Sequence, residues 1–350
     1  MNAERLLQQY ERISDAPDAI ARLRRFVLDL AVRGKLVPQS PNDEPASELL
    51  KRIEKEKARL LRAGEIRWDR PLPPVSGADA IIALPPGWQW VRLGRLAQMV
   101  TSGSRDWAKH YASEGAIFVR MGNLSKDHYR LRLDHIQRVK APEDGEGTRT
   151  RLAAGDILIS ITGEVGMLGL IPEGFGEAYI NQHTAMVRPM PEMQGRFLPE
   201  LFRSPFAQAQ FNEPQRGIKN SFRLTDITQF VVPLPPLAEQ HRIVAKIDEL
   251  MDLCDRLEAA REAREATRDR LAAASLARLD TPDPDAFKDD GRFALEALPT
   301  LTTRPDQIKR LRQAILNLAV RGKLVAQDTN EEPAVDGLRA VEELKAKQSI

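Results

Sequence analysis

The sequence predicts an α+β protein, in which one globular, β-rich domain is combined with long helices of antiparallel or coiled-coil type and a duplicated helical unit. Three observations lead to this prediction. A segment near the N-terminus recurs near the C-terminus, short strand-like stretches fill residues 84–237, and residues 238–279 contain neither glycine nor proline. Apolar stretches bounded by turn residues are typical of strands, whereas a long stretch without Gly or Pro favours one continuous helix.

The repeat is the strongest internal signal. Residues 17–46 recur at 305–334, and 20 of the 30 aligned positions are identical. In each copy apolar residues follow i, i+3, i+4, i+7 and i+8 spacing, which predicts one apolar helix face, and Gly34 or Gly322 then marks the helix end. The residues of this face are Leu23, Phe26, Val27, Leu30 and Ala31 in the first copy and Leu311, Ala314, Ile315, Leu318 and Ala319 in the second. A face that is used twice indicates an assembly surface, and the alternative is a helix packed in its own core.

The other boundaries follow from composition. Residues 1–62 are expected to form a helical unit that contains the first copy, and residues 63–83, which are rich in proline, are expected to be a linker. Residues 84–237 alternate strand-like stretches with Gly, Asn and Pro turns, which predicts the globular domain. Residues 280–304 are expected to be a second linker, and residues 305–350 to form the second, helical copy.

The segment 238–279 predicts a spacer arm. At ~1.5 Å per residue, a helix of this length spans roughly 60 Å, which is too long for the core of a small domain. Its apolar residues step by four and three, as along the seam of a coiled coil. The alternative is a helix that folds back in two pieces across its Ala-rich part. The seam residues are Ile243, Ile247, Leu250, Cys254 and Leu257.

The composition excludes several classes of protein. The chain is 42% apolar, as in folded proteins, and it contains no stretch of about 18 apolar residues that would cross a membrane. Its first residues are charged and lack the apolar core of a signal peptide. A single cysteine, Cys254, rules out a disulfide framework and a Cys-type zinc site, so a cytoplasmic protein is expected. The net charge of +2 is uninformative, because the local distribution of charge decides what binds.

No catalytic or metal-binding motif is found in the sequence. The RGKL segments at 33–36 and 321–324 lack the upstream Gly and the following Ser or Thr of a phosphate loop. Gly163, Gly166 and Gly169 do not have dinucleotide-binding spacing and are interpreted as turn glycines. The five histidines are scattered and form no metal-ligand pair. The chain is therefore predicted to bind and scaffold rather than to catalyse, with an enzyme of unfamiliar site as the alternative.

Four segments carry a family likeness: LPPGWQWVRLG, GDILISITGEVG, INQHTAMVRP and VVPLPPLAEQHRIVAKIDELMDLCDRLE. Together they resemble the specificity subunits of type I DNA restriction–modification enzymes. The last segment is the most characteristic, because a proline corner leads through LAEQ into a long helix. The repeated LAVRGKLV, followed by DEPA or EEPA, is similar to the linker element of one branch of that family.

The resemblance implies an architecture and a function. Such subunits typically carry two β-rich target-recognition domains separated by two long antiparallel helices, and each domain reads one half of a bipartite DNA site. A non-catalytic subunit is therefore implied, which binds double-stranded DNA, recruits methyltransferase subunits and, through them, nuclease and translocase subunits. No cofactor is expected on this chain, whereas S-adenosylmethionine, ATP and Mg²⁺ are expected on the partner subunits.

The chain departs from the family pattern because only one recognition domain is found. One interpretation is a half-subunit that pairs with itself or with a different half; self-pairing would imply an interrupted palindrome as the DNA site. Another is a truncated or phase-switched subunit that is inactive without another half. A protein-only adaptor that reads no DNA is a further alternative, and whether residue 350 is the natural end stays open.

Polar loops of the predicted domain are the candidates for DNA contact. Lys and Arg suit phosphates and guanine, and Asn and Gln suit adenine. Residues 101–110, 122–130 and 215–223 carry such side chains, whereas a role in shaping the fold is favoured for Thr162 and for 181–183. The candidate DNA-binding residues are Arg105, Lys109, Asn123, Lys126, His128, Arg130, Gln215, Arg216, Lys219, Asn220 and Arg223.

Apolar residues of the helical parts are the candidates for protein contacts. On the repeated helix they are predicted to dock the methyltransferase or to join the two copies, and on the spacer helix they are predicted to pair with a second helix. The repeat candidates are Leu23, Phe26, Leu30, Leu311, Ile315 and Leu318, and the spacer candidates are Ile243, Ile247, Leu250 and Leu257.

Overall fold

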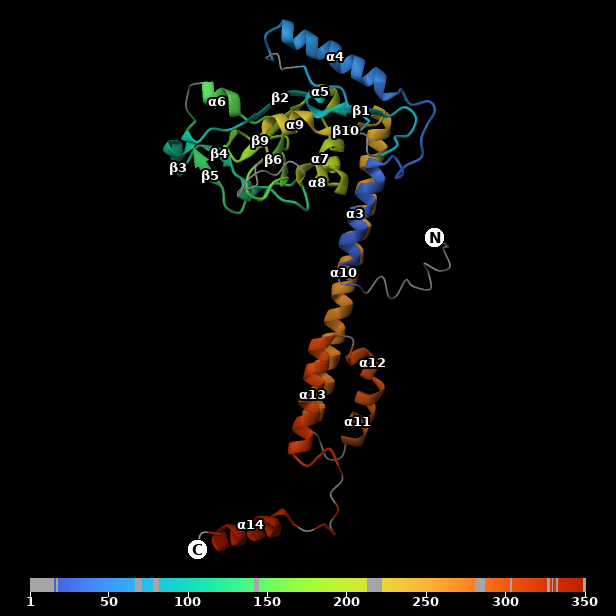
Figure 1. The fold of residues 1–350 in the computed structure, drawn as a ribbon, viewed down its shortest axis with the longest axis vertical. Helices are drawn as coiled ribbons and strands as arrows, with labels where there is room; N and C mark the ends of the chain where they lie inside the picture. The colour runs from blue at the N-terminus through green and yellow to red at the C-terminus, as the bar shows by residue number, and fades with distance from the viewer. Residues whose placement is uncertain are drawn as a thin grey trace. The chain divides into compact units, whose positions relative to one another are not determined.

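The chain divides into two units, Met1–Arg256 and Leu257–Ile350 (Figure 1). The structure is a computed structural model. It describes residues 16, 18–66, 71–77, 82–141, 145–212, 222–280, 287–302, 304–325, 328, 330–331 and 333–348. The first unit holds the β-rich domain and the first copy of the repeat, and the second unit holds the second copy.

Among the described residues, the strands form two four-stranded sheets and one two-stranded sheet. The first has the order β2-β9-β6-β7, with antiparallel neighbours. The second has the order β3-β5-β4-β8, in which β4 and β8 are parallel and the other pairs antiparallel. These strands are β2 (Ala97–Ser102), β3 (Tyr111–Ala112), β4 (Ala116–Val119), β5 (Gln137–Val139), β6 (Ile157–Ser160), β7 (Leu168–Leu170), β8 (Ala178–Ile180) and β9 (Thr184–Pro189).

Strand β6 lies inside the first sheet and is buried along its whole length. This burial explains why its first three residues, Ile157, Leu158 and Ile159, form a continuous apolar run instead of an alternating one. Leu158 pairs with Met186 of β9 and with Gly169 of β7. A Cβ on Gly169 would lie 2.7 Å from Leu124, so the core requires glycine there. Gly169 is therefore a packing glycine.

The two ends of the domain pair with each other. Strand β1 (Gln89–Arg92) runs antiparallel to β10 (Val231–Leu234), with Gln89 opposite Leu234. The chain consequently enters and leaves the domain side by side. Short helices complete it: α5 (Leu93–Leu96), η1 (Asp106–His110), η2 (Met121–Asn123), α6 (Gly145–Thr150), η3 (Pro191–Met193), α7 (Phe197–Arg203), α8 (Pro205–Asn212) and α9 (Leu224–Gln229).

The first copy of the repeat packs on this domain. Helix α3 (Ala19–Val32) contacts α7 and α8, and helix α4 (Ala46–Arg62) contacts α5 (Figure 1). Between the two helices, Gly34 has a φ of 62° and ends α3 as the sequence predicts. A Cβ on Gly34 would overlap Pro85, so glycine is also required by the close approach of the domain.

Helix α10 (Leu237–Asp280) confirms the predicted continuous helix at 238–279. Its residues up to Arg256 belong to the first unit. There Ile243 and Ile247 are buried in the same core as the domain, and Leu250 packs against that core. Three of the four predicted spacer residues are thus covered by the chain itself rather than left free for a second helix. Leu257, at the start of the second unit, is exposed.

In the second unit, residues expected to form a linker at 280–304 include two helices, which corrects that prediction. They are α11 (Phe287–Glu296) and α12 (Leu298–Leu301), followed by α13 (Pro305–Val320) and α14 (Ala334–Gln348). Ala294 of α11 is buried against Leu318 of α13. This tertiary contact stabilises a helix in a segment whose Pro and Asp content had indicated a linker.

Candidate nucleic-acid interface

Turns that are distant in the sequence meet at one edge of the β-rich domain. The backbone N–H of Gly103, just after β2, donates to the carbonyl oxygen of Asn181, just after β8, at 3.1 Å. A Cβ on Gly103 would overlap the carbonyl oxygen of Ile180. Asn181 Oδ1 accepts hydrogen bonds from the backbone N–H of His183 (3.1 Å) and from Thr184 Oγ1 (3.2 Å). Asn181 therefore shapes the β8–β9 turn, as the sequence had favoured.

The β6–β7 turn joins the same edge through His183. The imidazole Nδ1 lies 2.7 Å from Thr162 Oγ1, and Nε2 lies 2.9 Å from Gln182 Nε2. His183 is exposed, and Thr162 and Gln182 are half-buried. A hydroxyl, an imidazole and an amide thus stand together at the surface. Each of these groups can donate a hydrogen bond to a base edge or accept one from it.

The connection from β4 to β5 reaches this edge through Lys126. Its Nζ lies 3.1 Å from Glu164 Oε1 in the β6–β7 turn. Ser125 exchanges backbone hydrogen bonds with Leu168, at 3.1 and 2.7 Å. The backbone N–H of Phe222 donates to the carbonyl oxygen of Ile161 at 2.8 Å, which places Arg223 beside the same turn. We name this group of contacts the loop edge: Gly103, Lys126, Thr162, Glu164, Asn181, Gln182, His183, Phe222 and Arg223.

Trp107 anchors the segment that carries Arg105 and Lys109. Its indole is buried, 5.1 Å from the ring of Phe118 and 5.0 Å from that of Tyr179, measured between centroids. Burial raises the pKa of Tyr179 to about 12, aided by its hydrogen bond to Glu177, so this phenol stays neutral at physiological pH. The two cations flanking Trp107 are exposed on a segment that the core holds in place.

The predicted DNA-binding residues fall into three groups. Arg105, Lys109, Lys126, His128, Arg130 and Arg223 are exposed. Gln215, Arg216, Lys219 and Asn220 lie outside the described residues.

Asn123 forms the third group, and the structure gives its amide another role. Asn123 is buried; its Nδ2 donates to the carbonyl oxygen of Arg132 (2.8 Å), and its Oδ1 accepts from the N–H of Arg120 (2.9 Å). This side chain holds the loop together and is not presented to a base. The geometry instead adds Thr162, Gln182 and His183 as candidates. Thr162 stands two residues after the buried strand β6, and Gln182 and His183 stand two and three residues after the buried strand β8. Polar residues so soon after a buried strand are the signal in the sequence that could have indicated them.

The predicted docking residues are also divided by the structure. On α3, Phe26 is 56% exposed and Leu23 is exposed, whereas Leu30 is half-buried. On α13, Ile315 is exposed, Leu311 is half-buried and Leu318 is buried. The two copies therefore do not present the same residues to solvent.

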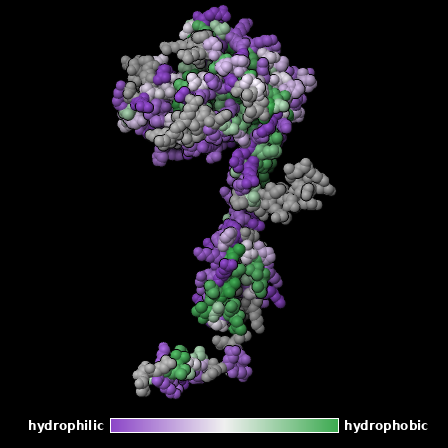
Figure 2. Space-filling view, viewed as in Figure 1, coloured by the Kyte–Doolittle hydropathy of each residue, from purple (hydrophilic) through white to green (hydrophobic). Residues whose placement is uncertain are grey.

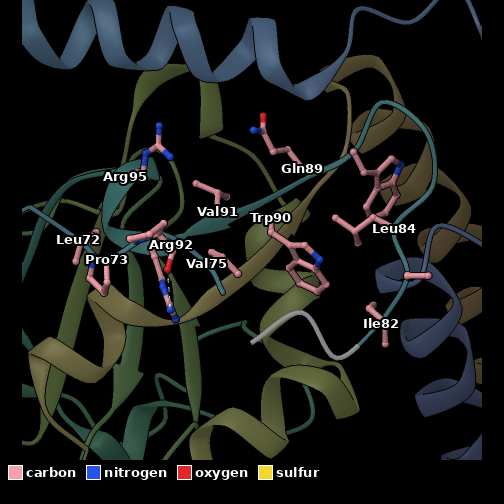
Figure 3. A pocket seen from close by; sticks show the side chains of 13 residues that line it. Leu72, Pro73, Val75, Ile82, Leu84, Gln89, Trp90, Val91, Arg92 and Arg95 are labelled. Carbon is pink, nitrogen blue, oxygen red and sulfur yellow. Dashed lines mark hydrogen bonds between the residues drawn. The ribbon is translucent and has the colours of Figure 1, made fainter. Parts of the chain in front are cut away.

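A cavity of about 900 Å³ lies beside β1, against residues 72–75 and 82–84 (Figure 3). Its walls include Trp90, and its cations are Arg92 and Arg95. Arg92 donates to the carbonyl oxygens of Gln229 (2.9 Å) and Pro74 (3.5 Å), and Arg95 pairs with Glu54. Among the described residues that line it, none has a carboxylate, imidazole, thiol or hydroxyl side chain, so these residues offer no acid–base pair.

Within the part of the chain that the structure describes, no group of three or more His, Cys, Asp or Glu residues is arranged to hold a metal ion. In the same described part, no helix is long and apolar enough to cross a membrane.

Comparisons with known proteins identify similar chains. Residues 85–265 match the family model of the type I restriction modification DNA specificity domain. The chain is 34% identical over 338 residues to the type I restriction enzyme EcoAI specificity subunit of Escherichia coli, covering 94% of this chain and 56% of that protein. It is 34% identical to the Escherichia coli EcoEI specificity subunit, covering 94% of this chain and 55% of that protein. The chain thus spans about half the length of these relatives.

Two solved structures are similar over most of the chain. A chain from a structure of the complex assembly and conformational transition of the type I R-M system has a TM-score of 0.44 and 22% identity, covering 75% of this chain and 56% of that one. The HsdS subunit from Thermoanaerobacter tengcongensis has a TM-score of 0.40 and 22% identity, covering 72% and 53%.

Proposed function

The chain belongs to the family of type I restriction–modification DNA specificity subunits, and on that premise we propose that it reads one half of a bipartite DNA site through the loop edge. It is a recognition component without a catalytic site of its own. Its partners would be methyltransferase subunits and, through them, nuclease and translocase subunits. S-adenosylmethionine, ATP and Mg²⁺ would bind those partner subunits.

The convergence of separate turns at one edge carries this proposal. Hydrogen bonds and an ion pair join the segments after β2, β4, β6 and β8 with the segment before α9. Direct reading of DNA needs amides, hydroxyls or guanidinium groups held at fixed positions, with cations beside them for the phosphates. Gln182 and Thr162 supply the first kind of group, and Lys126 and Arg223 supply cations.

Salt dependence tests the proposed site. Lys126→Ala in the full chain should weaken binding to a mixed pool of duplexes and reduce the slope of log affinity against log salt by about 1, because one phosphate contact is lost. Binding would be followed by fluorescence anisotropy at several salt concentrations. Lys51→Ala is the matched control, since Lys51 lies on α4, is exposed and pairs with Glu48 as Lys126 pairs with Glu164. Equal slopes of log affinity against log salt in the two variants would show that Lys126 does not contact DNA.

Docking of partner subunits is proposed for the exposed face of α3. Phe26 and Leu23 are exposed one turn apart on this helix, while its opposite face is buried on the domain. Apolar side chains grouped on one side of an otherwise charged helix favour a protein contact. The methyltransferase is the partner that the family suggests for this face.

A further inference from the structure

The connection from β4 to β5 carries a short outward loop that is held at both ends by the edge strand β7. Ser125 exchanges backbone hydrogen bonds with Leu168, and the carbonyl oxygen of Tyr129 accepts the N–H of Leu170 at 2.8 Å. These attachment points are two residues apart on β7 but four residues apart on the connection. The intervening residues 126–128 are therefore pushed out from the edge of the sheet, and all of them are exposed. We call residues 126–128 the tip.

Apolar residues on either side of the tip hold the base of this loop. Leu124 is fully buried, and Leu131 packs against the same hydrophobic cluster. Both lie over Gly169 of β7, where an added Cβ would come within 2.7 Å of Leu124 and 2.6 Å of Leu131. The base of the loop is thus fixed by packing as well as by backbone hydrogen bonds.

The side chain of Tyr129, next to the tip, is bound by a buried ion pair. Its phenol O–H donates to Glu200 Oε1 of α7 at 2.8 Å. Glu200 is 4% exposed, and its Oε2 accepts a hydrogen bond from Arg203 at 2.6 Å. The Arg203 guanidinium also lies 5.9 Å from the centroid of the Tyr129 ring. Burial and the neighbouring Glu200 charge raise the pKa of Tyr129 to about 12, so the phenol remains a hydrogen-bond donor at physiological pH.

Helix α7, which carries Glu200, is itself fixed in two ways. Its apolar side chains, among them Leu198 and Phe202, are fully buried in the core. The N–H of Glu200 donates to the carbonyl oxygen of Arg196 at 2.9 Å, and the guanidinium of Arg196 donates to Asp248 Oδ1 of α10 at 2.8 Å. The carboxylate that receives Tyr129 therefore stands on a helix that is bound both to the core and to α10.

The way in which the tip is held is more informative than its polarity. Hydrophilic residues occupy much of the domain surface in the view of Figure 2, so a polar tip is not by itself a sign of function. Burying a carboxylate costs free energy unless it is paired and hydrogen-bonded, and a loop that only has to be solvated needs no such group behind it. A base edge, in contrast, is read by side chains held at fixed positions. The network of Tyr129, Glu200 and Arg203 thus indicates a loop whose position matters.

We propose that Tyr129 and Glu200 are positioning residues for DNA reading, which hold the tip where Lys126 and His128 meet the DNA. Neither positioning residue contacts DNA itself. A loop that is fixed before binding loses less conformational entropy on binding, so loss of the anchor should weaken binding without removing a contact. The inference rests on the proposed function and deepens it, because it separates the residues that contact DNA from those that hold them in place.

Tyr129→Phe in the full chain tests the proposal, because it removes only the hydroxyl group that donates to Glu200. Binding would be followed by fluorescence anisotropy on a duplex that the wild-type chain selects from a random pool, and on the unselected pool. Affinity for the selected duplex should fall about 10-fold, and affinity for the pool should change by less than about 2-fold. The reason is that base reading depends on fixed side-chain positions, whereas attraction to phosphates does not.

A double-mutant cycle separates positioning from a general effect on the fold. In a Lys126→Ala, His128→Ala background, measured at low salt, Tyr129→Phe should weaken binding of the selected duplex by less than about 2-fold, because the side chains that it positions are gone. Tyr179→Phe is the matched control, since Tyr179 also donates to a glutamate, Glu177, at 2.6 Å. Tyr179 lies outside the loop, so its substitution should have the same effect in both backgrounds.

Hydrogen exchange tests the anchor without DNA. The N–H of Leu170, which donates to the carbonyl oxygen of Tyr129, should exchange at least about 5-fold faster in Tyr129→Phe than in the wild type, because the loop opens more often at that end. The N–H of Leu168, which donates to the carbonyl oxygen of Ser125 at the other end, should exchange at a nearly unchanged rate.

Three results would overturn the inference and leave the proposed DNA site in place. They are an equal loss of affinity for the selected duplex and the pool, the same loss from Tyr129→Phe in both backgrounds, and unchanged exchange at Leu170. Failure of the proposed function would look different. The wild-type chain would then select no sequence, or Lys126→Ala, His128→Ala would bind the selected duplex as tightly as the wild type does, and the inference would fall with it.

Discussion

At the scale of single residues, Glu239 shows how the domain and the repeat are joined. The carboxylate is buried and receives hydrogen bonds from Trp88 and Gln39, which come from two segments far from it in sequence. Burial raises the pKa of Glu239 above its usual 4.5, although the hydrogen bonds from Trp88 and Gln39 oppose this rise. The ionised form is consequently less favoured in the folded chain than in the unfolded one.

This raised pKa predicts a pH dependence of stability. The folded state binds the Glu239 proton more tightly than the unfolded state does. Protonated Glu239 therefore contributes to the stability of the fold, and this contribution is fully present below pH 4.5 and is lost as pH rises through the raised pKa. The free energy of unfolding of the wild type, relative to Glu239→Gln, should therefore fall as the pH rises above 4.5. Urea unfolding of both proteins at each pH measures it. A difference that stays constant or grows with pH would contradict the assignment.

At the scale of elements, the end of the repeated helix is the most informative feature. Gly34 and Gly322 have the same backbone conformation, but Gly34 is approached by Pro85 and Trp88. The glycine is therefore required twice in the first copy, once for its positive φ and once for the close approach of the domain.

The paired glycines make a matched experiment. Gly322→Ala should cost about 1 kcal/mol, because an L-residue is strained in the left-handed region. Gly34→Ala should cost more, since its methyl group must also displace Pro85. Native-state hydrogen exchange of the α3 and α13 amides gives the two opening free energies separately. Equal losses in the two helices would mean that Pro85 yields without cost.

The exposed face of α3 gives a second prediction at this scale. Phe26→Arg should abolish co-purification with the methyltransferase. The free energy of unfolding, measured by thermal unfolding, should stay within about 0.5 kcal/mol of the wild-type value, because Phe26 is exposed. Lys51→Ala on α4 serves as the control for a general surface effect. Retention of the complex by Phe26→Arg would exclude this face from docking.

At the scale of the whole molecule, the number of β-rich domains per chain decides how many DNA half-sites each chain would contact under the proposed function. The described part of the chain contains one β-rich domain and two copies of the helical repeat, the first of which packs on that domain.

The stoichiometry of DNA protection follows from this count. We expect one protected half-site for each chain in the complex with DNA, because each chain supplies one loop edge. Light scattering would count the chains and footprinting would count the half-sites. Two chains should protect an interrupted palindrome, and a single chain should protect one half-site. A single chain that protected two separated half-sites would contradict the assignment of one reading domain.

The sequence by itself determined the features that local patterns encode. Periodicity and the absence of Gly and Pro located α10, identity between distant segments revealed the repeat, and the glycine after the apolar face marked the end of α3 and α13. Continuous apolar runs bounded by turns predicted buried strands such as β6. These signals depend on residues that are close in the chain.

Only the tertiary structure decided what depends on residues that are far apart in the chain. Burial against Leu318 stabilises α11 where the sequence had indicated a linker. The side-chain amide of Asn123 forms hydrogen bonds with the backbone of its own loop. Hydrogen bonds between separate turns bring Thr162 and His183 together. The exposure of Val320, against the burial of Val32, follows from the same physical cause: a helix face has no fixed environment until another element covers it.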